Sequence, residues 1–124
     1  MITGIGVDIV KVQRMQRWLK MPALLERFFH QQEISTALSR GSSAELSLAA
    51  RFAAKEAFGK ALGTGFEGIV LKDIVVINCH NGKPEINVFG TALAALKQNG
   101  ANRIHLSLTH ESESAVAMVV LEEV

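Results

Sequence analysis

Alternating apolar and small residues open the chain and predict a strand over Ile2–Val10. One face of this strand carries Ile5, Val7 and Ile9. The opposite face carries Gly4, Gly6 and Asp8. The carboxylate therefore stands on a strand face that two glycines leave without side chains.

Apolar residues then recur at helical spacing. The spacing from Val12 to Leu19 predicts an amphipathic helix that stops before Pro22. Two further helices are expected near Ala23–Phe29 and Gln32–Leu38.

The longest helix is predicted after the turn-rich segment Ser39–Ser43. Ser42 and Glu45 have the spacing of a capping box, apolar periodicity continues to Leu62, and Gly63 suits a left-handed helix end. Alanine and glycine leave small side chains on several sides of this helix. We therefore expect a cleft or another backbone to approach it closely.

The second half of the chain is rich in strand signals. Segments Lys72–Cys79 and Glu85–Phe89 flank Asn81-Gly82, which predicts a β-hairpin. A short helix is expected over Thr91–Gln98, ended by Gly100.

Two last strands are predicted over Arg103–Thr109, with Ile104, Leu106 and Leu108 inward, and over the apolar segment Ala115–Leu121. They are expected to pair antiparallel. An N-terminal strand, a helical middle and later strands give the α+β class, with antiparallel strands and a long central helix.

The 124 residues fit one domain, 1–124. The single cysteine, Cys79, forms no internal disulfide and favours a reducing, cytoplasmic compartment. We expect neither a membrane span nor a secretion signal, because no apolar stretch approaches the roughly 20 residues of a span.

Charge is unevenly distributed although the formal net charge is only +1. The segment Lys11–Arg27 holds five basic residues and one acidic residue, a net +4. It is either a solvated helix face or a docking surface for an acidic partner, and no nucleic-acid partner is expected.

Two carboxylates from separate elements are the leading candidates for chemistry. Asp8 and Glu56 suit Mg²⁺, which takes one or two carboxylates plus water and substrate phosphate, although solvated acids are the commoner case. Glu56 and Lys60 also have the spacing of an ordinary helical ion pair.

Other candidate sites are weaker. Gly63-Thr64-Gly65 follows a helix, whereas phosphates bind at helix amino termini. A triad of Ser107, His110 and Glu111 lacks the nucleophile-elbow motif, and His30, His80 and Cys79 lack zinc-ligand spacing. The polar strand face with His105 and Thr109 holds either a phosphate or only water.

Four motifs in order give the chain a specific resemblance. They are Gly4-Ile5-Gly6-Val7-Asp8-Ile9-Val10, Arg51 to Gly65 with its Ala-Ala-Lys-Glu-Ala core, Asn81-Gly82-Lys83-Pro84, and His105-Leu106-Ser107-Leu108-Thr109-His110. From residue 2 to about residue 121, the chain resembles the holo-acyl-carrier-protein synthases, the small bacterial phosphopantetheinyl transferases.

The resemblance implies an enzyme of fatty acid biosynthesis that moves 4′-phosphopantetheine from coenzyme A to a serine of apo acyl carrier protein. Adenosine 3′,5′-bisphosphate is released and Mg²⁺ is required. It also implies homotrimers in which one subunit supplies the metal carboxylates and its neighbour supplies the Asn81–Pro84 turn and the His105–His110 strand.

The resemblance assigns roles residue by residue. Asp8 and Glu56 match the metal carboxylates, and Lys60 matches a lysine near the pyrophosphate. The residues matching coenzyme A contacts are Arg51, Lys55, Gly63, Asn81, Gly82, Lys83, Pro84, Thr109 and His110. The residues expected to bind the partner are Lys11, Arg14 and Arg17, of which Arg14 matches the family's docking arginine, whereas Lys11 stands where relatives often carry an acid.

The sequence leaves several choices open. The base that takes the serine proton is either a water on the metal or Glu56, and His105 has no assigned role. A non-catalytic nucleotide-binding module and a metal-dependent phosphohydrolase using Asp8 and Glu56 are the alternative functions.

Overall fold

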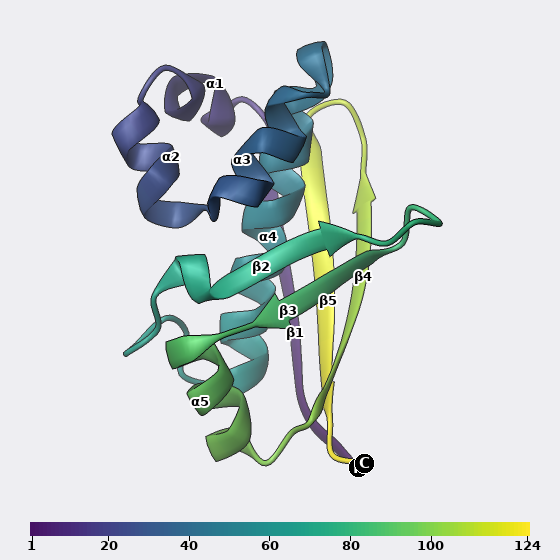
Figure 1. Ribbon diagram of the computed structural model, residues 1–124. Helices are drawn as coiled ribbons and strands as arrows, with labels where there is room; N and C mark the ends of the chain where they lie inside the picture. The colour runs from purple at the N-terminus through teal and green to yellow at the C-terminus, as the bar shows by residue number, and fades with distance from the viewer.

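Two antiparallel sheets and five α-helices make up the computed structural model, which describes residues 1–124 (Figure 1). In chain order the elements are β1 (Ile2–Lys11), α1 (Arg14–Leu19), α2 (Pro22–Phe28), α3 (Gln31–Leu38), the 3-10 turn η1 (Gly41–Ser43), α4 (Ala44–Leu62), the 3-10 turn η2 (Leu71–Asp73), β2 (Ile74–Asn78), β3 (Pro84–Val88), α5 (Gly90–Asn99), β4 (Arg103–His110) and β5 (Ser114–Glu122). The predicted α+β class is confirmed.

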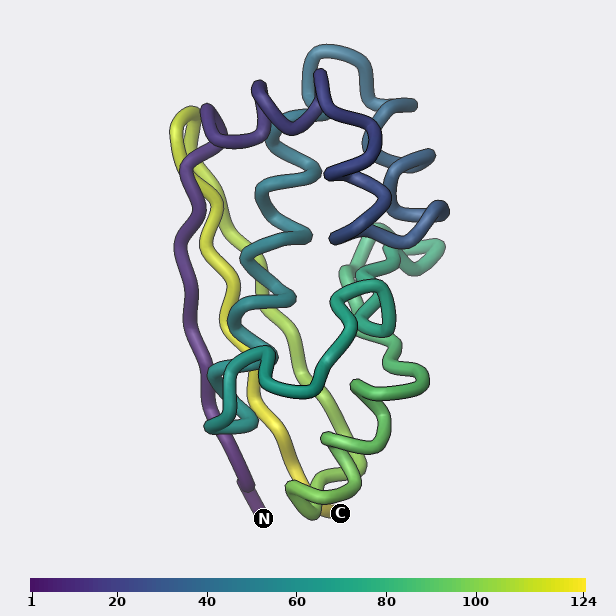
Figure 2. The backbone as a smooth tube through the Cα atoms, turned by 90° about the vertical axis from the view of Figure 1, so that its left-hand side faces the viewer, coloured from purple at the N-terminus to yellow at the C-terminus, as the bar shows by residue number.

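The larger sheet has the strand order β1-β5-β4, so β1 and β4 form its two edges. The predicted antiparallel pairing of the last two strands is confirmed, and β1 joins β5 from the other side. In this register Asp8 lies opposite Ala117, which lies opposite Leu108. Both chain termini lie at the same end of the molecule (Figure 2).

The long helix α4 lies against one face of this sheet, beside β1 (Figure 2). A methyl carbon built on Gly6 would stand 2.0 Å from the Ala57 carbonyl oxygen, and one on Gly4 would stand 2.0 Å from that of Ala61. Only glycine permits this approach, so the small residues of both elements bring the two backbones together, as expected for α4.

The opposite face of the sheet is exposed although it is apolar. Ile5, Val7 and Ile9 are 63%, 57% and 64% exposed, and Met118 on β5 is 44% exposed. The usual assignment of an apolar strand face to the core is therefore reversed on β1, because the glycines allow α4 to occupy the other face.

The hairpin β2–β3 confirms the prediction made from Asn81-Gly82. A five-residue loop, Cys79–Lys83, joins the strands, and Gly82 has a φ of 84°, the left-handed conformation that glycine tolerates. The tip of the hairpin extends beyond β4 (Figure 1). The residues before Ile74 that were predicted as strand belong to η2 instead.

The predicted capping box at the start of α4 is wrong. Ser43 is the N-cap residue and no side chain caps the helix, because the 3-10 turn η1 leads directly into it. Ser43 has φ −95° and ψ 9° instead of the extended conformation from which a cap reaches back to the helix. The end at Gly63 is confirmed, with a φ of 83°.

A capping box does form at α3. The His30 side chain accepts from the Gln32 N–H, and Glu33 accepts from the His30 N–H. The other short helices begin and end within two residues of the predicted positions, and Lys11 belongs to β1. None of the helices has the length and apolarity needed to cross a bilayer.

Candidate active site

Asp8 and Lys60 meet where β1 passes the second half of α4. The Lys60 ammonium lies 2.9 Å from Asp8 Oδ1 and 3.2 Å from the Val7 carbonyl oxygen. The Asp8 side chain is largely covered, whereas that of Lys60 is exposed. The ammonium is therefore a cation held on the Asp8 carboxylate at the surface, and hydrogen bonding to Asp8 raises the Lys60 pKa.

Glu56 lies one helical turn before Lys60 and is partly buried. Burial, followed by repulsion from the Asp8 carboxylate, raises the pKa of Glu56, while Arg14 and Lys60 act in the opposite direction. The expected ion pair between Glu56 and Lys60 does not form, because Lys60 donates to Asp8. Two interacting carboxylates thus lie near each other, with Lys60 bonded to one of them and Arg14 acting on the other.

The donor set fits a hard divalent cation. No group of three or more His, Cys, Asp or Glu side chains gathers anywhere in the chain, so a site that relies on protein ligands alone is absent. Asp8 and Glu56 supply the one or two carboxylates that Mg²⁺ takes when water and substrate phosphate complete its coordination. The mutual repulsion of these carboxylates is what such a cation would relieve.

The three predicted partner-binding residues lie together. Lys11, Arg14 and Arg17 line an open depression of about 550 Å³ with Ile9, Val10 and Gln13. The Arg14 guanidinium also stands 5.4 Å from the Trp18 ring centroid and 5.1 Å from that of Phe52. These contacts hold Arg14 over α4, at the end of β1 that carries Asp8.

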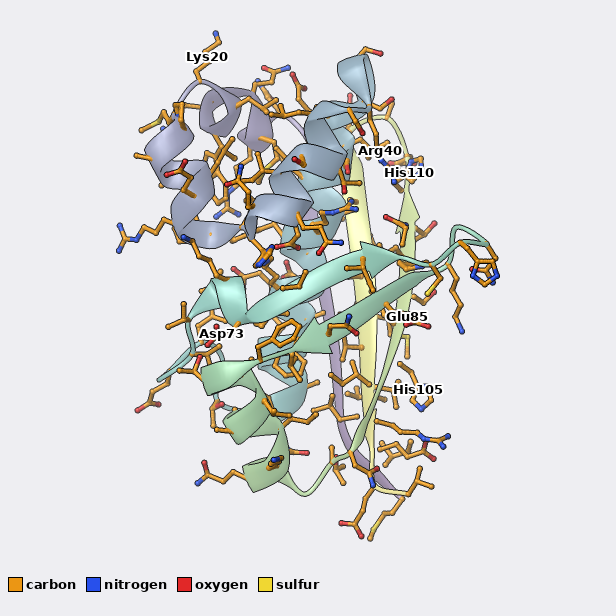
Figure 3. All side chains as sticks on the ribbon, in the orientation of Figure 1. Lys20, Arg40, Asp73, Glu85, His105 and His110 are labelled. Carbon is orange, nitrogen blue, oxygen red and sulfur yellow. The ribbon has the colours of Figure 1, made fainter.

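A second cavity, of about 290 Å³, gathers most of the other predicted residues. It lies between α4, the β2–β3 hairpin and the end of β4, and it contains none of Asp8, Glu56 and Lys60. Its predicted members are Arg51, Gly82, Pro84, Thr109 and His110. Arg40, Ser47 and Asn78 also line it, and no sequence motif predicted these three. Arg40 and His110 lie at the upper end of β4 in Figure 3.

Arg51 is buried at the base of this cavity. Its Nη1 lies 2.7 Å from Ser47 Oγ and its Nη2 lies 2.8 Å from Asn78 Oδ1, while its Nε has no partner. Burial lowers the Arg51 pKa, and neighbouring Arg40 lowers it further, although Glu33 acts the other way. Two close guanidiniums with neutral partners form a site suited to a phosphate.

Lys55 does not reach either cavity, contrary to the predicted coenzyme A contact. Its side chain is 0% exposed, and its ammonium lies 2.7 Å from Glu33 Oε1 and 3.0 Å from the Leu71 carbonyl oxygen. It also donates to the Ile74 carbonyl oxygen. All three of its protons are used, so Lys55 is structural: it joins α3 and α4 to the start of β2.

The remaining predicted coenzyme A contacts outside that cavity, Gly63, Asn81 and Lys83, lie on the surface. Lys83 and Pro84 line a groove of about 300 Å³ with His105, between β3 and β4. Asn81 Oδ1 accepts from the Lys83 N–H, 3.1 Å away. The Gly63 N–H is occupied by the Lys60 carbonyl oxygen.

The structure also gives the positions of His105 and of the candidate triad of Ser107, His110 and Glu111. His105 Nε2 lies 2.9 Å from Glu122 Oε1, on the exposed sheet face. Ser107 and His110 are three residues apart on one strand and therefore point to opposite faces, so no triad forms.

Comparison with known proteins decides the family. The model of the 4′-phosphopantetheinyl transferase superfamily matches residues 4–119. The chain belongs to this superfamily. It is 57% identical over 122 residues to the holo-[acyl-carrier-protein] synthase of Treponema denticola. The matched region covers 98% of this chain and 99% of that protein. This phosphopantetheinyl transferase is therefore an enzyme, as expected.

Solved structures have the same fold as this phosphopantetheinyl transferase. The holo-[acyl-carrier-protein] synthase of Neisseria meningitidis is 38% identical with a TM-score of 0.87, covering 99% of this chain and all of that one. The Bacillus anthracis enzyme, solved in complex with CoA (3′,5′-ADP), is 37% identical with a TM-score of 0.83, covering 100% and 99% of the two chains.

Proposed function

We propose that this chain transfers 4′-phosphopantetheine from coenzyme A to a serine of apo acyl carrier protein, releasing adenosine 3′,5′-bisphosphate. The observation that carries the proposal is the cluster of Asp8, Glu56 and Lys60, formed by β1 and α4 in a chain whose relatives are holo-[acyl-carrier-protein] synthases. Two carboxylates and an ammonium suit phosphoryl transfer, in which charge on the moving group must be stabilised.

Coenzyme A binds along the hairpin and the end of β4. Arg51 and His110 supply positive or hydrogen-bonding groups to its phosphates, and the cavity between them supports this role. The other contacts proposed are Gly63, Asn81, Gly82, Lys83, Pro84 and Thr109. A complex of the Bacillus anthracis relative with CoA (3′,5′-ADP) supports the choice of donor.

Asp8 and Glu56 hold Mg²⁺ in this proposal, since two carboxylates that repel each other are a donor set that fits this ion. When bound, Mg²⁺ neutralises charge on the pyrophosphate and so favours displacement at phosphorus.

The remaining chemistry falls to the chain's own residues. The serine oxygen forms a bond to the pantetheine-bearing phosphorus, its proton passes to Glu56 or to a water beside the two carboxylates, and the pyrophosphate P–O bond breaks toward adenosine bisphosphate. Lys60 is exposed and is held by the Asp8 carboxylate and the Val7 carbonyl oxygen, so it can turn toward the departing phosphate and stabilise its charge or donate a proton.

The basic depression binds the carrier protein. Lys11, Arg14 and Arg17 offer three cations next to the strand end that bears Asp8, so an acidic carrier docks within reach of the reacting serine.

The active unit is a homotrimer with its sites between subunits. Asp8 lies on one edge strand of the sheet and His110 on the other, separated by β5, or about 10 Å between strands. The protruding hairpin tip and the exposed apolar face of Ile5, Val7 and Ile9 support contact with a neighbouring copy. One subunit contributes the carboxylates, and the next contributes the turn and the end of β4.

Mass spectrometry tests the function directly. Incubation with coenzyme A, Mg²⁺ and an apo carrier protein should raise the carrier's mass by one phosphopantetheine group. A binding module would leave the mass unchanged, and a phosphohydrolase would consume coenzyme A when no carrier is present. Either result would contradict the proposal.

A further inference from the structure

Asn78, the last residue of β2, joins two arginines to the turn that follows it. Its Oδ1 accepts from Arg51 Nη2 at 2.8 Å and from Arg40 Nη2 at 3.2 Å. Its Nδ2 donates to the Gly82 carbonyl oxygen at 3.2 Å. Guanidiniums only donate and a carbonyl only accepts, so these partners define the orientation of the amide.

The neutrality of Asn78 matters for the arginine side of this network. Arg40 and Arg51 come from different segments and repel each other, yet one shared oxygen holds both at the cavity. Ser47, the other side-chain partner of Arg51, is also neutral, and the nearby Glu33 carboxylate is paired with Lys55. Both guanidinium charges are therefore oriented without being neutralised and remain available to an anion.

The amide side of the network holds the turn. Within the turn, the Gly82 N–H donates to the Cys79 carbonyl oxygen at 2.7 Å, and the Lys83 N–H donates to Asn81 Oδ1 at 3.1 Å. These bonds fix the loop internally. The bond from Asn78 to Gly82, together with the bonds from Asn78 to the arginines, ties the loop to α4 and to Arg40.

We propose that Asn78 is a positioning residue for coenzyme A: it sets the two arginines and the Asn81–Pro84 turn in one fixed arrangement. This inference rests on the proposed function, because it takes those groups as coenzyme A contacts. Asn78 acts through the two arginines and the turn, and its amide takes no part in the displacement at phosphorus.

Asn78→Asp is the sharpest test because it keeps the shape of the side chain. The carboxylate still accepts from both arginines, but it offsets one of their two positive charges and faces the Gly82 carbonyl oxygen without a proton to donate. Asn87→Asp, which adds the same charge at an exposed position on β3 of the same hairpin, is the matched control.

Calorimetry with coenzyme A and steady-state kinetics provide the readout. In Asn78→Asp, the Kd and KM for coenzyme A should rise about tenfold or more, the loss typical of a charge-assisted hydrogen bond. The KM for the carrier protein should stay within about twofold, a split that a general loss of stability would not produce. Asn87→Asp should behave like the wild type.

Equal coenzyme A affinity in the two aspartate variants would overturn the role of Asn78. If the wild type itself does not bind coenzyme A, the proposed function fails first and the role of Asn78 fails with it. Should Asn78→Asp not fold, Asn78→Ala removes the network without adding a charge. It should weaken coenzyme A binding and speed hydrogen exchange at the Gly82 and Lys83 amides, and wild-type affinity in this variant would also overturn the inference.

Discussion

Two lysines five residues apart on α4 have opposite environments. Lys55 is fully buried and donates to Glu33 and two backbone carbonyl oxygens. Lys60 is exposed and pairs with Asp8. A buried, fully bonded ammonium cannot follow a substrate, whereas an exposed one on a single carboxylate can. Residue chemistry in this molecule is therefore decided by burial as much as by residue type.

Asp8→Ala should abolish phosphopantetheine transfer while the protein stays folded. The Asp8 carboxylate has one side-chain hydrogen-bond partner, the exposed Lys60 ammonium, and Asp8 is not a member of the apolar core, so its loss removes a proposed metal ligand and leaves that core intact. Transfer measured by carrier mass should fall to background, and circular dichroism and melting should match the wild type. Full activity in this variant would remove the metal role of Asp8.

Glu56 should give the metal-free protein an unusual pH dependence. Burial and the Asp8 charge raise its pKa above the usual 4.5, so the folded state binds this proton more tightly than the unfolded state does. Its contribution to stability is fully present below pH 4.5 and is lost as the pH rises through the raised folded value. Mg²⁺ binding should be lost over the same range as the pH falls.

The control for this dependence is Glu56→Gln, which cannot titrate. Urea unfolding at several pH values, compared with the wild type, isolates the contribution of this one group. If the two proteins show the same pH dependence, the Glu56 pKa is not raised. Titration of Mg²⁺ against pH supplies a second, independent reading.

At the scale of elements, the buried Lys55–Glu33 ion pair forms hydrogen bonds with the edge of β2 that no strand pairs with. Lys55 donates to the Ile74 carbonyl oxygen and Glu33 accepts from the Val76 N–H, so these groups on the free edge of β2 are bonded by side chains. The pair thereby fixes the hairpin against α3 and α4. The position of the proposed coenzyme A turn depends on this attachment.

Lys55→Met should destabilise the fold by about 3–5 kcal/mol, the typical cost of leaving one charge of a buried pair uncompensated. The double variant Lys55→Met/Glu33→Gln should lose less, because no buried charge remains and the amide oxygen can still accept. Denaturant unfolding measures both. If Lys55→Met had the unfolding free energy of the wild type and a raised KM for coenzyme A, Lys55 would be a coenzyme A contact, as first predicted.

Charge reversal at Arg14 and Arg17 should slow capture of the carrier protein. Both residues line the basic depression. Charges at the rim of an interface mainly steer association, so the rate of association with the carrier protein should fall and lose part of its salt dependence. Coenzyme A affinity should hardly change. Lys20→Glu is the control, since Lys20 points away from the rest of the molecule (Figure 3); equal effects would mean that only net charge matters.

At the scale of the whole molecule, the two halves of the proposed site are separated in one chain. The cavity with Thr109 and His110 contains neither proposed metal carboxylate, and β5 lies between the edge strands that carry Asp8 and His110. The exposed apolar face of the sheet offers a surface through which copies can assemble. A neighbouring copy can then bring the missing half.

Mixing two inactive variants tests this arrangement. Asp8→Ala trimers and His110→Ala trimers should each be nearly inactive, and refolding equal amounts together should restore about a quarter of wild-type activity. In a cyclic trimer each interface joins one chain's Asp8 side to the next chain's His110 side, so random mixing leaves about one interface in four intact. Mixed trimers, verified by a mass tag, that stay at parental activity would contradict a shared site.

The sequence by itself determined the local elements and the residues available for chemistry. Periodicity placed the strands and helices, Asn81-Gly82 placed the hairpin, and glycine placed the ends of α4 and α5, because these signals act within a few residues. The capping box at Ser42 failed because a 3-10 turn could replace it, and two serines in a row leave the exact N-cap open.

Only the tertiary structure decided which of these residues meet. Lys55 and Lys60 lie in one motif, yet packing of α3 and β2 buries the first while the passage of β1 gives the second its partner. Arg40, Asn78 and Arg51 come from three segments, and no local period relates them. Contacts between distant segments depend on how sheets and helices pack in three dimensions, so they are settled by the fold of the whole chain.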